Sequence, residues 1–275
     1  MADPSTIDYD AEYNNRARVA DNAQIMAGWA RDAAAYRSIH PPVTIAYGTR
    51  ERETIDLFDA GQAGPLVMFI HGGYWQALDG SSSSHLARGL NAHGISVAVP
   101  TYDLCPNVSV AKILDQMRAA AMKLHGIAGQ RIVAAGHSAG GHLAACLLAT
   151  DWKALDPDLL ADLVPAAYAI SGLFDLKPLA STYLNKALQL DDTEAMRVSP
   201  MFWTPPQGKS LHAITGALES SEYHRQSREM AQRWKTGGAR TEFELAPGAN
   251  HFTIVAPLAD PDSKMVRDII RLRGA

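Results

Sequence analysis

A serine in this chain stands in a pattern typical of catalytic nucleophiles. Gly136-His137-Ser138-Ala139-Gly140 has the form G-x-S-x-G and lies between Arg131–Ala135, which predicts a strand, and Ala139–Thr150, which predicts a helix. Such a turn exposes the serine hydroxyl and sets the next backbone N–H at a helix start, where it faces developing negative charge. Ser138 is therefore the predicted nucleophile, and the Ala139 N–H is a predicted oxyanion donor. The alternative is a glycine-rich helix start around an ordinary serine.

A pair of glycines follows an earlier strand. His71-Gly72-Gly73-Tyr74-Trp75 comes directly after the apolar run Leu66–Ile70, one strand–helix–strand–helix stretch before Ser138. Two adjacent glycines let the main chain come close to a substrate carbonyl, so that the N–H groups of Gly72 and Gly73 can bind an oxyanion. A flexible turn would explain a glycine pair alone, but the two motifs at this spacing together indicate a serine hydrolase.

The general base must be chosen among ten histidines. In a site of this kind the order along the chain is serine, acid, histidine, and the histidine follows the last strand. Thr241–Ala246 predicts that strand, and Asn250-His251-Phe252 follows it through a turn-rich bridge. His251 is therefore the predicted base. His137, beside the serine, is interpreted as structural, and His71 as an anchor of its own loop.

The acid should lie in the loop after the penultimate strand, Leu211–Thr215. Glu219 is the predicted acid because it precedes the next helix, whereas Glu222 falls in the first helical turn, where a carboxylate is favourable for the helix dipole alone. Asp175, after an earlier strand candidate, is the alternative, because some folds of this type carry the acid there. The carboxylate would orient His251 and stabilise its imidazolium form.

Strand-like and helix-like segments alternate along the chain, which predicts a mostly parallel sheet with helices on both faces. With the two motifs, this pattern predicts the α/β-hydrolase fold. We expect one domain, residues 1–275, with an N-terminal helical extension over 1–42 and a helical cap insertion over 176–207 at the carboxyl edge of the sheet, where such folds bind ligands. The predicted strands are Val43–Tyr47, Thr54–Phe58, Leu66–Ile70, Ile95–Val99, Arg131–Ala135, Ala166–Ile170, Leu211–Thr215 and Thr241–Ala246. The predicted helices are Asn14–Tyr36, Ser82–His93, Val108–Ile127, Ala139–Thr150, Tyr223–Thr236 and Ser263–Leu272.

The composition is that of a soluble globular protein. Hydrophobic residues make up 47% and charged residues 20% of the 275, and the formal net charge is −4. This charge gives no basic field that would collect phosphates, so nucleic acid is not an expected partner. No apolar stretch is long enough to span a bilayer, the first ten residues are polar and acidic, and two cysteines, Cys105 and Cys146, are too few for a disulfide framework. We expect a cytoplasmic protein that acts on a small molecule without binding membranes.

Five segments are distinctive when taken together. They are His71-Gly72-Gly73-Tyr74-Trp75-Gln76, Gly136-His137-Ser138-Ala139-Gly140-Gly141-His142-Leu143, Ile170-Ser171-Gly172-Leu173-Phe174-Asp175-Leu176, Glu219-Ser220-Ser221-Glu222-Tyr223-His224-Arg225-Gln226-Ser227 and Asn250-His251-Phe252. They resemble the α/β-hydrolase type of kynurenine formamidase (arylformamidase), and the likeness covers most of the chain from about Tyr47 onward, with Tyr13-Asn14-Asn15 also similar. The resemblance implies a serine–aspartate–histidine triad, which falls here on Ser138, Glu219 and His251, with a glutamate one methylene longer than the usual acid. It is also compatible with a homodimer.

The reaction implied by this resemblance is acyl transfer from N-formylkynurenine to the serine and then to water, which yields kynurenine and formate. The formyl side of the site should be cramped, and the leaving-group side should accept an aromatic ring. No metal or cofactor is expected, because no histidine–carboxylate cluster has ligand spacing. The predicted aromatic walls, each with core packing as its alternative, are Tyr74, Trp75, Tyr102, Phe174 and Trp203.

Two other functions remain open at this point. A small-molecule carboxylesterase or another amidase would use the same triad, and relative rates on formyl anilides and short-chain aryl esters would distinguish it. A non-catalytic, ligand-binding member of the fold would usually lack the nucleophile or the base. Failure of a fluorophosphonate probe to label Ser138 would favour that function.

Overall fold

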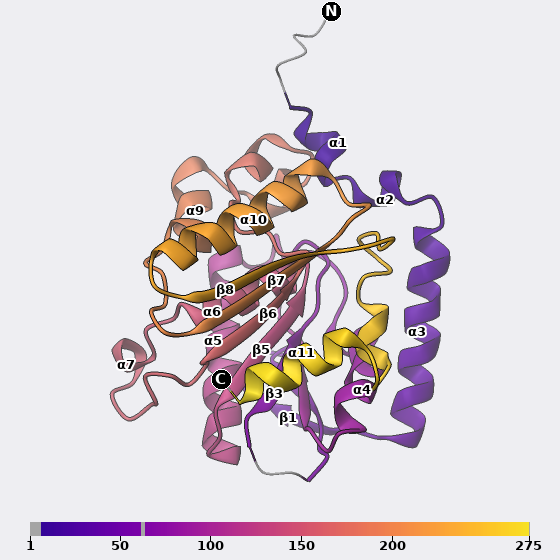
Figure 1. Cartoon of the computed structure of the whole chain (residues 1–275), viewed down its shortest axis with the longest axis vertical. Coiled ribbons are helices and arrows are strands. Elements are labelled where there is room, and N and C mark those ends of the chain that lie inside the picture. The colour runs from indigo at the N-terminus through magenta and orange to yellow at the C-terminus, as the bar shows by residue number, and fades with distance from the viewer. Residues whose placement is uncertain (1–6, 62–63, 275) are drawn as a thin grey trace, which may run out of the picture.

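Eight strands form a single sheet (Figure 1). Along the chain they are β1 Val43–Ala46, β2 Thr54–Phe58, β3 Leu66–Ile70, β4 Val97–Pro100, β5 Ile132–His137, β6 Ala166–Ile170, β7 Ser210–Gly216 and β8 Arg240–Ala246. The computed structural model describes residues 7–61 and 64–274 of the chain. The order across the sheet is β1-β2-β4-β3-β5-β6-β7-β8, antiparallel for the pairs β1–β2 and β2–β4 and parallel from there on. The predicted, mostly parallel sheet is therefore confirmed.

The central strands are apolar on both faces. Every residue of β3, β5 and β6 is buried, as expected for parallel strands that helices cover on both sides. Ile70 at the end of β3 pairs with Gly136 near the end of β5, and Gly216 at the end of β7 pairs with Ala246 at the end of β8. The loops that follow these four strands therefore leave the sheet at the same edge, and they are the loops that carry the predicted site residues.

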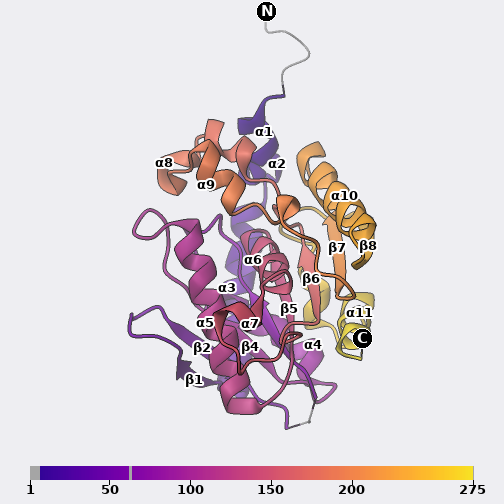
Figure 2. The same ribbon diagram turned by 90° about the vertical axis from the view of Figure 1, so that its left-hand side faces the viewer.

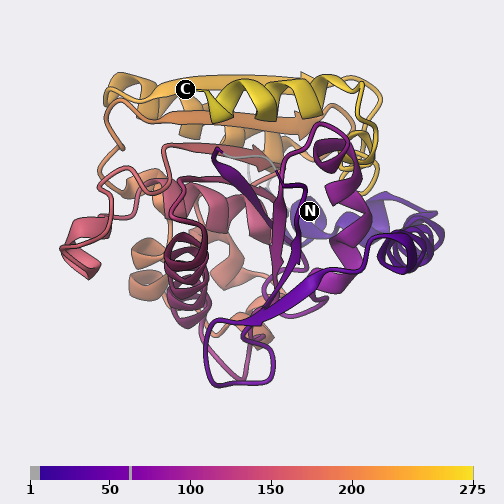
Figure 3. The ribbon, with the colours of Figure 1, turned by 90° about the horizontal axis from the view of Figure 1, so that it is seen from below.

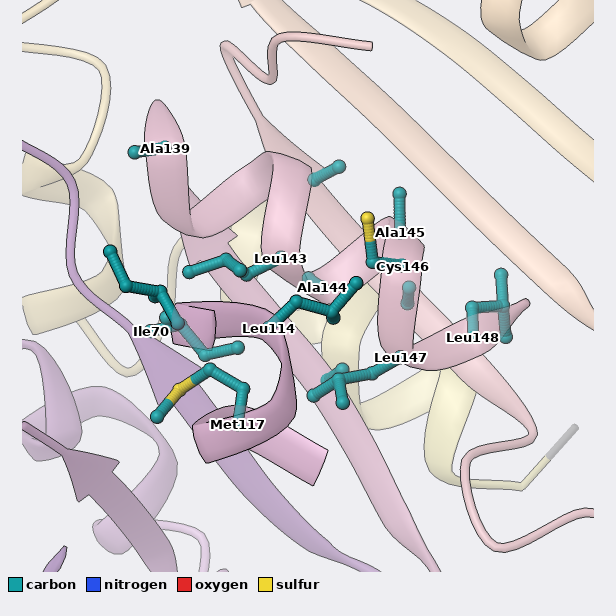
Figure 4. Packing of buried hydrophobic residues seen from close by; sticks show 14 of the residues in the cluster. Ile70, Leu114, Met117, Ala139, Leu143, Ala144, Ala145, Cys146, Leu147 and Leu148 are labelled. Carbon is teal, nitrogen blue, oxygen red and sulfur yellow. The ribbon is translucent and has the colours of Figure 1, made fainter. Parts of the chain in front are cut away.

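Helices cover both faces of the sheet. They are α1 Tyr9–Tyr13, α2 Asn15–Arg18, α3 Asn22–Ile39, α4 Arg88–Asn91, α5 Val110–Ala128, α6 Ala139–Leu148, α7 Trp152–Leu155, α8 Asn185–Leu188, α9 Asp192–Arg197, α10 Ser221–Thr236 and α11 Lys264–Arg273, with 3₁₀ segments η1 Gly80–Ala87, η2 Lys177–Ser181, η3 Pro200–Phe202 and η4 Ala256–Ala259. α5 and α6 belong to one hydrophobic core and α4 and α11 to the other, and Figure 3 shows α5 and α11 on opposite sides of the strands. α6 is buried along its whole length, with Leu143 and Leu147 beside Leu114 and Met117 of α5 (Figure 4).

The N-terminal region differs from the single helix predicted over Asn14–Tyr36. The short α1 comes first, and α2 and α3 are separate helices. The Asn14 side chain accepts a hydrogen bond from the Ala17 N–H at 3.1 Å and so caps a new helix, and Val19 is extended where α2 ends. The sequence pattern misses this break because neither glycine nor proline marks it. Residues 1–6 of the predicted extension lie outside the described residues.

Residues 176–207 form short helical turns, as the sequence predicts for this segment. They contain η2, α8, α9 and η3, and Pro178 and Pro200 lie in the first turns of η2 and η3. Figure 2 shows α8 and α9 at the same end of the molecule as α1, and the Tyr183 N–H donates to the Asp10 carboxylate over 2.7 Å. This segment therefore contacts residues 8–18, which we call the N-terminal arm.

Two further sequence features have a structural counterpart. Among the described helices, none combines the length and the apolar character that crossing a bilayer requires. Cys105 and Cys146 are both buried as unpaired thiols. Burial raises the pKa of the Cys105 thiol to about 11, so this thiol stays protonated and unreactive at neutral pH.

Candidate active site

Ser138 lies at the sharp turn between β5 and α6. Its backbone angles, φ 58° and ψ −119°, fall in a region that residues other than glycine rarely adopt. Glycines permit the turn, because a Cβ on Gly140 would collide with the Ile70 carbonyl oxygen and one on Gly136 with the Gly140 carbonyl oxygen. The turn sets the Ser138 side chain at the edge of the sheet and the Ala139 N–H at the first position of α6.

Glu219 and His251 meet at the same edge. His251 Nδ1 lies 2.6 Å from Oε2 of Glu219, whose side chain is completely buried. At Oε1, Glu219 accepts hydrogen bonds from the Ser171 hydroxyl at 2.5 Å and the Gly216 N–H at 2.7 Å. Because an ionised carboxylate only accepts hydrogen bonds, His251 Nδ1 carries the proton and Nε2 is left to accept one.

The two other carboxylates weighed for this position are engaged elsewhere. Asp175 accepts a hydrogen bond from the Lys177 N–H at 3.1 Å and lies 3.9 Å from the Arg225 guanidinium. Glu222, in the first turn of α10, pairs with Arg225 at 2.7 Å. The fold thus brings Glu219, and neither of these two, to the imidazole of His251.

The loop after β3 backs the serine directly. A Cβ on Gly72 would lie 3.0 Å from the Ser138 Cβ and 2.9 Å from the His137 carbonyl oxygen, so only glycine allows this approach. Gly73 has φ 101°, which glycine adopts without strain. Within residues 7–61 and 64–274, the backbone N–H groups of Gly72, Gly73 and Ala139 donate to no protein acceptor. These amides are therefore available to a ligand oxygen.

Two other histidines near the serine are held neutral. Burial lowers the pKa of His71 to about 4, its Nδ1 lies 2.8 Å from the Gly72 carbonyl oxygen, and its ring stacks on Tyr102 with centroids 4.2 Å apart. Burial, and then the neighbouring His251, lower the pKa of His137 well below its usual value. These contacts fit the structural roles expected of both side chains.

A cavity of about 460 Å³ opens beside the turn that follows β5. Tyr74 lines this cavity, as predicted, but the other four predicted aromatic walls do not. Trp75, Tyr102 and Phe174 are completely buried in the core, and Trp203 lies at a separate surface depression. Core packing, the alternative for these side chains, accounts for Trp75, Tyr102 and Phe174, because the loops after β3, β4 and β6 turn them inward.

Comparisons with known proteins agree with this geometry. Residues 67–255 match a protein family described by the α/β hydrolase fold. Kynurenine formamidases from Danio rerio and Salmo salar are 31% and 29% identical over 84% of this chain and over 81% and 82% of their own lengths. A solved structure of a candidate thioesterase from Silicibacter sp. is 33% identical and superposes with a TM-score of 0.83, over 96% of this chain and 100% of that one.

This chain belongs to the α/β-hydrolase family. Within the family it is arylformamidase-like, and it is a hydrolase that acts on amide or ester bonds. Both conclusions confirm the expectation from the five sequence segments. The order of the strands and the loop positions of Ser138, Glu219 and His251 follow the same plan.

The N-terminal arm and α3 line the cavity of this hydrolase without having been predicted to do so. The 176–207 segment, which was expected at this edge of the sheet, also contributes to the lining. The likeness of Tyr13-Asn14-Asn15 to the formamidases was a sequence signal for the arm, whereas the alternation of apolar and polar residues in α3 does not separate cavity walls from core. The residues concerned are Asn14, Asn15, Arg16, Met26, Trp29, Tyr183 and Leu184.

A hydrogen-bond network joins the arm to Tyr74 and Tyr223. Asn15 Nδ2 donates to the hydroxyls of Tyr74 at 3.2 Å and Tyr223 at 2.9 Å, and these two hydroxyls lie 2.7 Å apart. The Tyr74 hydroxyl donates to the Tyr13 carbonyl oxygen at 2.7 Å, so its proton is committed there. Tyr223 therefore donates its own proton to the Tyr74 hydroxyl, and its ring packs against the His251 imidazole with centroids 4.8 Å apart. Burial raises the pKa of Tyr223, which therefore remains a donor at neutral pH.

One group of side chains among the described residues, from β7, β8 and α11, has the spacing of metal ligands. His212, Glu244 and Asp268 offer ligand atoms within 4.8 Å of one another. The Lys264 ammonium lies 2.6 Å from Glu244 and 2.7 Å from Asp268, and the Arg271 guanidinium lies 3.4 Å from Asp268, so two cations already face the two carboxylates. This cluster is therefore a salt-bridge network on the sheet face under α11.

Proposed function

We propose that this hydrolase cleaves an aryl formamide, N-formylkynurenine, into kynurenine and formate. The observation that carries the proposal is the Glu219–His251 pair, 2.6 Å apart, beside Ser138 at a cavity that Gly73 also lines. The similarity to kynurenine formamidases over most of the chain supports this substrate.

The first step is attack of the serine on the formyl carbon. His251 Nε2 accepts the proton as the Ser138 oxygen forms a bond to that carbon, and Glu219 holds the ring and stabilises the imidazolium. The single contact of Glu219 Oε2 with Nδ1 fixes the tautomer that this step needs.

The second step is collapse of the tetrahedral intermediate. Its oxyanion accepts hydrogen bonds from the N–H groups of Gly72, Gly73 and Ala139, and removing one such donor costs about 3 kcal/mol in comparable sites. His251 then protonates the departing nitrogen, the C–N bond breaks, and the formyl group remains on Ser138 as an ester. Water repeats the sequence on this ester and releases formate.

The cavity suits a small acyl group and an aromatic leaving group. The close approach of Gly72 to the Ser138 Cβ, 3.0 Å from an added Cβ, leaves little room behind the acyl carbon. Apolar side chains from α3 and from two loops line the cavity beyond the serine. Among them are Trp29, Leu78 and Phe252. Such walls bind an aromatic ring by contact and stacking.

Relative rates test the proposal. We expect kcat/KM to be higher for N-formyl-L-kynurenine than for p-nitrophenyl acetate and lowest for p-nitrophenyl butyrate, because a cramped acyl site penalises the longer chain. Ser138→Ala should lower kcat by about 10⁶-fold, as nucleophile removal does in serine hydrolases. Hydrolysis of the esters without the formamide would favour a carboxylesterase with the same triad. Hydrolysis of S-phenyl thioacetate alone would favour a thioesterase.

A further inference from the structure

The cavity beside Ser138 has an unusual charge. Among the described residues that line it, Arg16 is the permanently charged side chain, and none is an aspartate or a glutamate. Glu219 lies behind His251 and is completely buried. The chain as a whole has a net charge of −4, so Arg16 does not belong to a general basic surface. The electrostatics of the cavity therefore favour an anionic group on the ligand.

The Arg16 side chain is not used to hold the arm together. Within the described residues it takes part in no ion pair, and the one hydrogen bond to Arg16 goes to its backbone carbonyl. Arg18, on the same short helix, instead pairs with Glu12 at 3.4 Å and donates to the Ala11 carbonyl oxygen at 3.3 Å. The exposed guanidinium of Arg16 is thus available at the cavity, with the paired donors that carboxylates bind well.

The neighbours of Arg16 are fixed relative to the candidate base. Asn15 is buried and donates to the Tyr223 hydroxyl, and the Tyr223 ring packs against the His251 imidazole with centroids 4.8 Å apart. Tyr13, two residues earlier, donates to the Glu222 carboxylate at 2.8 Å in the interior. The backbone that carries Arg16 is therefore held at a set place beside the reacting atoms, which reduces the ordering cost of binding.

We propose that Arg16 binds a carboxylate carried by the leaving group of the substrate, so that the hydrolase selects anionic aryl substrates over neutral ones. The inference rests on the proposed function, because it takes Ser138 as the reacting residue and assumes that the part of the site that holds the acyl group is small. The carboxylate then belongs to the part of the substrate that departs. N-formylkynurenine carries such a group. Arg16 would also recognise other aryl leaving groups whose carboxylate lies at a similar distance from the bond that is cleaved.

A matched pair of esters isolates this charge. 4-Acetoxybenzoate and its methyl ester share the acyl group and the ring and differ in one negative charge on the leaving group. We expect Arg16→Gln to raise KM for 4-acetoxybenzoate about tenfold, the loss of one exposed charge-assisted contact, with kcat little changed. The methyl ester should be hydrolysed as by the wild type, and Arg16→Lys should restore part of the difference. Arg18→Gln removes the same charge from the same helix and serves as the control.

Several results would overturn the anion site. Equal loss on both esters would give Arg16 a merely structural role, and an unchanged KM for 4-acetoxybenzoate would exclude the contact. If the esters are hydrolysed and N-formyl-L-kynurenine is not, the formamidase proposal fails. The comparison of the two esters still decides the role of Arg16 in that case. If neither ester turns over, calorimetric binding of L-kynurenine decides it. A weaker affinity in Arg16→Gln than in the wild type supports the site, and equal Kd values exclude it.

Discussion

At the residue scale, the acid of the candidate triad holds its own loop as well as the imidazole. Glu219 Oε1 accepts from the Gly216 N–H and the Ser171 hydroxyl, which leaves Oε2 to His251. Glu219→Gln keeps the size but loses the charge, and we expect kcat to fall about 10⁴-fold, as when an amide replaces a triad acid. Glu219→Asp keeps the charge but shortens the reach, and we expect a smaller loss.

The rate of p-nitrophenyl acetate hydrolysis measures this difference, with thermal melting to show that each variant is folded. Asp175→Asn is the matched control, since it makes the same chemical change at the carboxylate that does not reach His251. If Glu219→Gln keeps a kcat near that of the wild type, or if Asp175→Asn shows the larger loss, Glu219 is not the acid.

A second prediction at this scale concerns Tyr223. Its ring packs against the His251 imidazole with centroids 4.8 Å apart, and its hydroxyl accepts a hydrogen bond from Asn15, so Tyr223→Phe removes a polar group beside the proposed base. We expect kcat to fall roughly tenfold, the value of one hydrogen bond of about 1.4 kcal/mol, with little change in KM. Tyr74→Phe, which loses a bond to the Tyr13 carbonyl instead, should change KM more than kcat. A wild-type kcat in Tyr223→Phe would contradict the role of this hydroxyl.

At the element scale, strands were predictable where apolar residues run without interruption. β3 and β6 have the predicted bounds, because their side chains must be buried whatever surrounds them. β2 also has the predicted bounds, although only Ile55 and Phe58 of its residues are buried. The loops that carry the candidate triad were predictable too, since glycine requirements and chain order can be read from the sequence. Which aromatic side chains line the cavity could not be predicted in this way. Trp75 and Tyr74 are adjacent aromatics with φ 56° and 50°, and only the path of the loop after β3 turns Trp75 into the core and leaves Tyr74 at the cavity.

The docking of the N-terminal arm is testable at this scale. The Tyr13 hydroxyl donates to Glu222 at 2.8 Å and accepts from Gln226 at 2.7 Å in the interior. Tyr13→Phe leaves both partners without this contact, and we expect the free energy of unfolding to fall by about 1–3 kcal/mol. Urea unfolding measures the change. Tyr9→Phe, half-exposed on the same helix, is the control and should unfold as the wild type does. Equal stability of the two variants would show that the arm is not held by Tyr13.

At the scale of the whole molecule, buried histidines couple stability to pH, because burial lowers the pKa of His137 and His212 as well as of three others. His71, His85 and His142 lie in different elements, and burial lowers the pKa of each to about 4. In the unfolded chain their pKa is about 6.5. Between these values the unfolded chain binds more protons than the folded one, so the stability is fully present above pH 6.5 and is lost as the pH falls toward 4. Each histidine contributes a slope of up to about 1.4 kcal/mol per pH unit.

Urea unfolding between pH 7.5 and 5 measures this slope above the range in which most carboxylates gain protons. We expect the free energy of unfolding to decrease steadily below pH 6.5. His85→Gln should reduce the slope by the contribution of one histidine, because the glutamine binds no proton in the folded or the unfolded chain. This reduction is expected whatever the substitution does to the stability at pH 7.5. His93→Gln, at an exposed position, should leave the slope as it is. A stability independent of pH across this range would mean that these rings bind protons equally in the folded and unfolded chain, and a full slope in His85→Gln would show that His85 does not contribute to it.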